Sequence, residues 1–255
     1  MGKKFKQSRI ANKIYKSHLN LVSDMNDTLV FLGQVKLTLE EKKWEYERSV
    51  NDKDKKYYIT NIKDKYAQRT DEELRNIYDK FLSRELYESF FVTLISKFED
   101  FLESCLLIIL EEHPDRISLN SEGVETSKNV PLEDILKSEN KEEIIKKIIG
   151  GKLATLFYAK PEQYMKYFIN VTRFKIPKET IENFIERKAT RDIIIHNRSI
   201  INNTYLEKAG GKSRGNINKK VIFDKNYFDI SIILLRGISG IITIEAERLY
   251  PATNK

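Results

Sequence analysis

The stretch LYESFFVTLISKFEDFLESCLLIIL, residues 86–110, decides the fold because its apolar side chains recur at helical spacing. The positions that share this broad apolar face are Phe90, Phe91, Leu94, Ile95, Phe98, Phe101, Leu102, Cys105, Leu106 and Ile109. A face of this width is typical of a helix that lies in a protein core. We therefore predict a long core helix from about Asp71 to Glu112, which Pro114 ends.

Helical patterns also dominate the rest of the chain. Residues 5–48 carry apolar positions at mixed three- and four-residue spacing without a proline, which predicts one or two long N-terminal helices. Residues 51–70 are densely charged and predict a connection or the polar end of a helix. Further helices are predicted at 131–138, 141–149, 161–171, 177–195 and 227–249, with loops at 115–130 and 207–220 and a short extended piece at 221–224. Isoleucine in the last helix favours strands, but the length of that segment and its ending EAERL favour a helix.

The composition supports an all-α globular protein. Of 255 residues, 40% are hydrophobic and 33% are charged, which excludes a wholly disordered chain. The 10 glycines and 5 prolines interrupt the chain rarely, so long helices are favoured over a sheet protein with many turns. We expect an N-terminal helical extension over residues 1–70 and a helical domain over residues 71–255, or one continuous domain over residues 1–255.

The cysteine and histidine content bounds the compartment and the chemistry. A single cysteine, Cys105, permits no internal disulfide and fits a reducing cytoplasm. We find no segment of the secretory-signal type, and the apolar runs look too short to cross a bilayer, so we expect a cytoplasmic protein without a membrane partner. One cysteine and three scattered histidines lack metal-ligand spacing, and no phosphate-binding glycine loop is present. We expect no metal and no cofactor.

The net charge of +7 is confined to one segment. Between Arg187 and Lys225 the chain has ten basic and three acidic residues, so the remaining 216 residues sum to zero. Clustered lysine and arginine attract phosphates, which points to a polyanionic partner such as RNA, although a lysine-rich solvated loop is the alternative. The residues that we expect to bind nucleic acid are Arg187, Lys188, Arg198, Lys212, Arg214, Lys219 and Lys220.

The stretch ERKATRDIIIHNR, residues 186–198, places charged groups where an apolar helix face should continue. On a helical wheel Asp192 and His196 fall on the apolar stripe that contains Ile181 and Ile195, and Arg191 falls at its edge. Charges there must be hydrogen-bonded in the core, or the stripe must open into a cleft at this end. Asp192 and His196 are four residues apart, so the carboxylate could orient the imidazole and raise its pKa.

RDIIIHN, residues 191–197, resembles the signature of HEPN domains (higher eukaryotes and prokaryotes nucleotide-binding), in which a histidine follows an arginine and four further residues. Asp192 matches the polar residue that often follows the arginine, and Asn197 after the histidine also resembles many members. The surrounding order is similar: a core helix with a glutamate in an apolar run (FEDFLESCLL), then HNRSIINNTYLEKAG, a basic loop and a final apolar helix. The resemblance covers roughly residues 80–250. Arg198 and Ser199 depart from it, because many relatives have a glycine turn there.

The resemblance implies a HEPN-like helical bundle with metal-independent endoribonuclease activity, typical of toxins and antiphage effectors. His196 would transfer a proton at the 2′-hydroxyl or at the leaving 5′-oxygen, and Arg191 would stabilise charge on the phosphate. With Asp192 and Asn197 these form the predicted catalytic set, and the product would be a 2′,3′-cyclic phosphate. Arg191 and His196 lie about 140° apart on the wheel, so we expect a homodimer that lines one cleft with both copies. An antitoxin or a defence-system protein is a further expected partner.

Two other functions stay open on the residues alone. A non-catalytic RNA- or nucleotide-binding module would use the same basic segment and leave RNA intact. A helical interaction protein would work through its long N-terminal helices, and His196 would then be structural.

Overall fold

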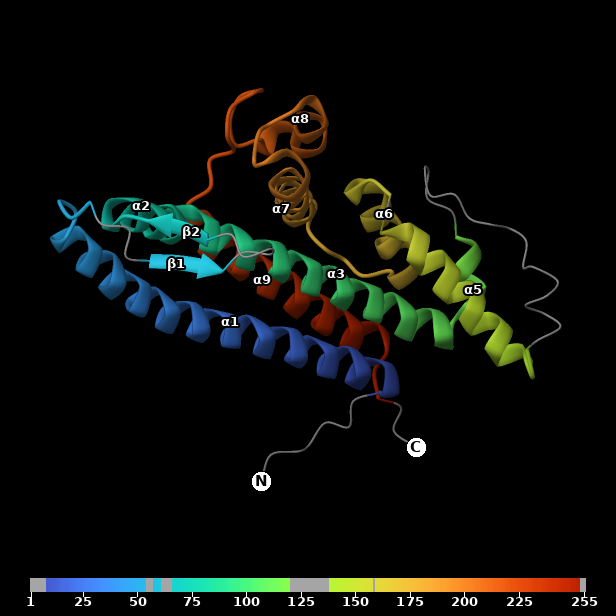
Figure 1. The fold of residues 1–255 in the computed structure, drawn as a ribbon. Coiled ribbons are helices and arrows are strands. Elements are labelled where there is room, and N and C mark those ends of the chain that lie inside the picture. Colours follow the sequence, from blue (N-terminus) through green and yellow to red (C-terminus); the bar gives the residue numbers. More distant parts are fainter. Residues whose placement is uncertain (1–7, 54–56, 61–65, 120–137, 158, 253–255) are drawn as a thin grey trace. The chain divides into compact units, whose positions relative to one another are not determined.

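The computed structural model describes residues 8–53, 57–60, 66–119, 138–157 and 159–252, and in these residues the protein is all-α apart from one hairpin (Figure 1). The helices are α1 (Arg9–Arg48), α2 (Asp71–Lys80), α3 (Leu86–Glu112), α5 (Lys141–Leu156), α6 (Pro161–Thr172), α7 (Lys178–Asn197), α8 (Asn203–Ala209) and α9 (Lys225–Leu249). A π-helical turn (Phe81–Glu85) and two 3-10 turns (Pro114–Ser118 and Gly210–Lys212) complete the helical structure described. The all-α prediction with long N-terminal helices is confirmed.

Most predicted helices are observed with shifted ends. The helix predicted from Asp71 to Glu112 consists of α2, the π-helical turn and α3, and a capping box of Thr70 and Glu73 starts it. The helix predicted at 141–149 extends to Leu156, and the isoleucine-rich C-terminal segment is helical as predicted. Residues 131–137 of the helix predicted at 131–138 and residues 120–130 of the loop predicted at 115–130 lie outside the described residues. Residues 221–224 form no strand, but Ile200 and Lys220 form an isolated antiparallel bridge.

Residues 51–70 differ from the prediction of a plain connection. They contain the antiparallel strands β1 (Tyr57–Thr60) and β2 (Tyr66–Arg69), with Tyr57 opposite Arg69 and Thr60 opposite Tyr66. The sequences YYIT and YAQR are rich in the aromatic and β-branched residues that favour strands. Because the surrounding residues are densely charged, we predicted a connection or the polar end of a helix here.

The chain forms two compact units that do not follow its order. Unit 1 comprises Met1–Ser23, Val92–Ile222 and Ile230–Lys255, and unit 2 comprises Asp24–Phe91 and Phe223–Asp229. Residues 70 and 71, where we placed the end of the N-terminal extension, both fall within unit 2. Unit 2 has its own aromatic contacts, including Phe91 with Phe223 at 5.2 Å between ring centroids.

Aromatic side chains from several helices form the core of unit 1. The rings of Phe98 on α3 and Phe184 on α7 lie 5.0 Å apart, and the ring of Tyr164 on α6 lies 6.4 Å from Phe184. All three side chains are fully buried. Burial of each such ring contributes about 1.5–3 kcal/mol, so these contacts fix α7 against α3 and α6.

Helix α9 combines a core face with unusual apolar length. By length and composition alone it is the one helix in the described part of the chain that could cross a membrane, with a mean hydropathy of 1.6 over its most apolar window. We expected no run of this kind. Half of that window is buried inside the protein.

Candidate functional site

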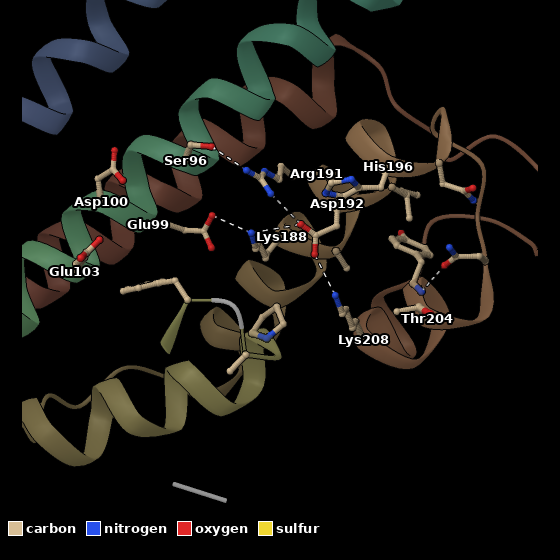
Figure 2. Close-up of a pocket in the computed structure, with 18 of the residues that line it drawn as sticks. Ser96, Glu99, Asp100, Glu103, Lys188, Arg191, Asp192, His196, Thr204 and Lys208 are labelled. Carbon is tan, nitrogen blue, oxygen red and sulfur yellow. Dashed lines mark hydrogen bonds and ion pairs between the residues drawn. The ribbon is translucent and has the colours of Figure 1, made fainter. Parts of the chain in front are cut away.

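A cavity of about 720 Å³ in unit 1 contains the residues that the sequence singled out (Figure 2). Its walls come from α3, from α7 and α8, and from the corner between α5 and α6. Cavities of this volume are typical of small-molecule and nucleotide sites. Arg191, Asp192, His196 and Asn197, the four predicted catalytic residues, all line it.

The orientation of α7 explains why these polar residues share one cavity. Phe184, Ala189 and Ile193 are buried, whereas Ile195, which we placed in the apolar stripe, is 44% exposed. Near its C-terminus, α7 therefore turns a different side toward the core from the one that the helical wheel predicted. The sequence left two alternatives for these charged residues: hydrogen bonds in the core, or a cleft at this end of the stripe. The structure has a cleft, and Asp192 and His196 of α7 line it.

Arg191 is held by contacts on both sides of its guanidinium. Nη2 donates to Ser96 Oγ of α3 at 3.3 Å, and Nη1 lies 3.2 Å from Asp192 Oδ1 (Figure 2). Its Nε atom is buried without a hydrogen-bond partner. These contacts fix the plane of the guanidinium, and its buried Nε–H stays unsatisfied.

Asp192 contacts three cations rather than the imidazole. Besides Arg191, Lys208 Nζ donates to Oδ2 at 3.1 Å and Lys188 Nζ lies 3.4 Å from Oδ1. Burial alone would raise the pKa of Asp192, but Lys188, Lys208 and Arg191 together hold it below its usual value. No hydrogen bond joins Asp192 to His196 in the part of the chain that the structure describes, so the pairing inferred from their spacing is absent from this state.

His196 and Asn197 end the helix at the mouth of the cavity. The His196 side chain is exposed, and its ring makes no hydrogen bond with any described residue. An accessible, uncommitted imidazole is able to accept or donate a proton. Asn197 instead has a structural contact, because its Nδ2 donates to the Ile200 carbonyl at 2.6 Å and closes the turn after α7.

A buried ion pair in the wall of the cavity was missed by the sequence reasoning. Lys188 Nζ donates to Glu99 Oε2 at 3.0 Å, and the two side chains are only 9% and 12% exposed. Burial raises the pKa of Glu99, and Lys188 and Arg191 oppose this rise. Tyr164 Oη also donates to Glu99, at 3.3 Å. The available signal was a glutamate inside the apolar run FEDFLESCLL, which we noted only as part of the family resemblance.

The residues predicted to bind nucleic acid fall into two groups. Arg187 pairs with Glu186, Lys188 with Glu99, and Lys212 with Glu179. Arg214 Nε donates to the Ile222 carbonyl at 2.9 Å. The other three residues, Arg198, Lys219 and Lys220, are exposed. The prediction of a polyanionic partner therefore rests mainly on this second group. Lys208, which we did not nominate, lines the cavity.

The exposed basic residues lie on a backbone that is fixed by hydrogen bonds. Arg198 and Ser199 have left-handed φ values of 53° and 64°. A left-handed non-glycine residue costs about 1 kcal/mol, and such strain is often found at functional sites. The Ile201 N–H donates to the Lys219 carbonyl and the Val221 N–H donates to the Ser199 carbonyl, which pairs this turn with the basic loop.

A buried network joins α8 to α7. Glu186 Oε1 accepts hydrogen bonds from Thr190 Oγ1 at 2.7 Å and from Tyr205 Oη at 3.1 Å. Tyr205 Oη in turn accepts the Arg214 N–H at 3.0 Å. Burial and the neighbouring Glu186 raise the pKa of Tyr205 to about 12. This network holds Lys208 of α8 over the cavity.

Searches against known protein families, curated proteins and solved structures gave no match to this chain. No group of acidic, cysteine or histidine side chains suited to a metal ion occurs among the described residues. The arrangement offers a guanidinium, an imidazole and two further cations around one cavity. These groups are suited to binding a phosphate and to transferring a proton next to it.

Proposed function

We propose that this chain is a metal-independent endoribonuclease of the HEPN type, which acts on RNA in the cytoplasm as a toxin or antiphage effector. A single observation carries the proposal: Arg191, Asp192, His196 and Asn197 line one cavity. Arg191 and His196 diverge by about 140° on the helix itself, so their presence in one cavity depends on the walls around α7.

The chemistry matches cleavage by the substrate's own 2′-hydroxyl. Its oxygen attacks the phosphorus, the bond from phosphorus to the 5′-oxygen breaks, and the products are a 2′,3′-cyclic phosphate and a 5′-hydroxyl. His196 takes the proton from the 2′-hydroxyl or gives one to the leaving oxygen. Arg191 stabilises the charge on the phosphate through its planar donors. DNA is spared because it lacks the 2′-hydroxyl.

The ion pairs around Asp192 allow Arg191 to turn to a phosphate. When a substrate phosphate takes over the guanidinium, Asp192 keeps the contacts with Lys208 at 3.1 Å and Lys188 at 3.4 Å. The carboxylate is therefore not left unpaired, which is the costly outcome for a half-buried charge. Asp192 acts in this scheme as a positioning residue.

A homodimer supplies the second proton-transfer group. One imidazole cannot be base and acid at the same moment, so we propose that two copies line one cleft and contribute an Arg191 and a His196 each. The exposed Arg198, Lys219 and Lys220 would hold the flanking phosphates. A ribonuclease of this kind would have to be inhibited in its own host cell. We therefore propose an antitoxin or a defence-system protein as a partner.

Two observations favour the other functions. His196 supplies the one imidazole among the residues that line this cavity of about 720 Å³, which favours a nucleotide-binding module without catalysis. Several large apolar side chains of α1 are exposed, which favours a protein-interaction role; they include Val30 at 67%, Phe31 at 58% and Trp44 at 55%.

Expression in a bacterial host separates these functions. The wild type, Arg191→Ala, His196→Ala and the surface control Lys178→Ala should be induced while growth and RNA integrity are followed. We expect the wild type and Lys178→Ala to arrest growth and degrade RNA, and the other two variants to restore both. A folded wild type that leaves growth and RNA unaffected would contradict the ribonuclease proposal.

A further inference from the structure

The cavity carries different chemistry on its different walls. Its cations, Lys188, Arg191 and Lys208, come from α7 and α8. The wall from α3 carries carboxylates, including Glu99 and Glu103, one helical turn apart (Figure 2). The residues that line the cavity from the corner between α5 and α6 are apolar: Leu153, Ala154, Phe157, Ala159 and Pro161.

Glu103 differs from the other carboxylates of the cavity because it is half-buried and uncommitted. Glu99 is paired with Lys188 at 3.0 Å, and Asp192 contacts three cations. Asp100 is exposed on the α3 wall. Glu103 has no ion pair or side-chain hydrogen bond with the residues that the structure describes. A half-buried carboxylate without a partner can gain hydrogen bonds when a ligand enters.

The charge of Glu103 limits what can lie against it. Phosphate oxygens are repelled, so the phosphate of an RNA ligand belongs at the cationic wall and the α3 wall must receive hydrogen-bond donors. Ionised carboxylates only accept, and their two oxygens match a pair of adjacent donors. Unstacked RNA bases are commonly read along their Watson–Crick edges and packed against apolar or aromatic side chains. Phe157 and Pro161 provide such a surface here.

Among the four RNA bases, guanine alone presents two adjacent donors on this edge, N1–H and the 2-amino group. Adenine and cytosine place a ring-nitrogen acceptor beside their amino group, which would face the second carboxylate oxygen. Uracil places one N–H between two carbonyl acceptors. We propose that the α3 wall is a base subsite in which Glu103 binds the N1–H and 2-amino groups of guanine. This inference rests on the proposed function in taking RNA as the ligand.

Mononucleotide binding tests the subsite without any need for cleavage. Calorimetric titration of the folded protein with GMP, IMP and AMP separates the contacts, because IMP differs from GMP only in lacking the 2-amino group. Loss of one hydrogen bond to a charged group weakens binding about tenfold or more, so GMP should bind at least about tenfold more tightly than IMP or AMP.

The variant Glu103→Gln replaces two acceptors by one acceptor and one donor. We expect it to lose the preference for GMP and to bind AMP as well as or better than GMP, because an amide matches the donor and acceptor of adenine. The control Glu111→Gln, on the same helix outside the cavity, should keep the wild-type order. Equal binding of the three nucleotides by the wild type, no binding of GMP, or an unchanged preference in Glu103→Gln would each overturn the proposal.

Failure of the subsite and failure of the ribonuclease proposal give different results. A protein that prefers GMP through Glu103 but leaves RNA intact contradicts the ribonuclease proposal and supports the subsite. A protein that cleaves RNA through His196 with no guanine at or beside the cut, and shows no GMP preference, overturns the subsite alone.

Discussion

Replacement of Lys188 by methionine tests the buried polar network that supports the cavity. The Lys188 ammonium group lies 3.0 Å from Glu99 and 3.4 Å from Asp192, and its side chain is only 9% exposed. Methionine keeps most of the length of the side chain and its apolar contacts but removes the charge. The change therefore leaves the carboxylate of Glu99 buried with only the Tyr164 hydroxyl as a hydrogen-bond donor.

The expected loss of stability follows from these contacts. Removal of one partner of a buried ion pair typically costs about 3–5 kcal/mol. Asp192 keeps its ion pairs with Arg191 and Lys208 in this variant. We therefore expect the free energy of unfolding to fall by about 3 kcal/mol, near the lower end of that range. For a chain of this size that corresponds to a fall in Tm of roughly 6–12 °C.

The loss should also depend on pH. Burial already raises the pKa of Glu99 above 4.5, so the folded protein binds its proton more tightly than the unfolded chain. Removal of Lys188 raises this pKa further. The cost is then largest where Glu99 is ionised and shrinks as the pH falls toward 4.5 and the carboxyl becomes neutral.

Urea unfolding followed by circular dichroism at about pH 8 and about pH 5 gives the free energy of unfolding for each variant. The double variant Lys188→Met with Glu99→Gln should recover much of the loss, because no buried charge then lacks a partner. The control Lys178→Met, on the same helix and 90% exposed, should change stability by less than about 0.5 kcal/mol. An equally small effect of Lys188→Met would refute the network as described.

Three further variants test other parts of the site. Tyr205→Phe removes the hydroxyl that donates to Glu186 and accepts the Arg214 N–H. It should lower the free energy of unfolding, measured in urea titrations, by about 1–3 kcal/mol. Arg198→Gly should raise that free energy by up to about 1 kcal/mol by relieving its left-handed φ of 53°, yet weaken RNA binding in filter assays. The double variant Lys219→Ala with Lys220→Ala should lower the slope of log affinity against log salt by about 1–2, and an unchanged slope would show that these lysines do not contact RNA.

Much of the fold was predictable from sequence because it depends on local patterns. The apolar spacing of residues 86–110 and the EAERL ending of the C-terminal segment identified α3 and α9. The strands at Tyr57–Thr60 and Tyr66–Arg69 escaped notice because the surrounding charges resembled a loop. Their pairing is a contact between segments, which a scan along a single segment does not detect.

The cavity was predictable only in part because its chemistry depends on residues far apart in the chain. The pattern around Arg191 and His196 predicted which part of α7 lines the cavity. Lys188 was predicted to bind RNA, whereas in the structure it pairs with Glu99. This pairing could not be read from the local sequence because Glu99 lies 89 residues earlier. The helical wheel also misplaced the core-facing side of α7, since the rings of Phe98 and Tyr164 fix that side through contacts with Phe184.

The chemistry of RNA ends tests the central claim most directly. Purified wild type, Arg191→Ala and His196→Ala should each be incubated with a defined RNA in the presence of a chelator, and the product termini identified by mass spectrometry. We predict 2′,3′-cyclic phosphate and 5′-hydroxyl ends from the wild type and a loss of about a hundredfold or more in rate for both variants. Intact RNA with the folded wild type, or the same ends formed equally fast by both variants, would contradict the assignment of this cavity as a ribonuclease site.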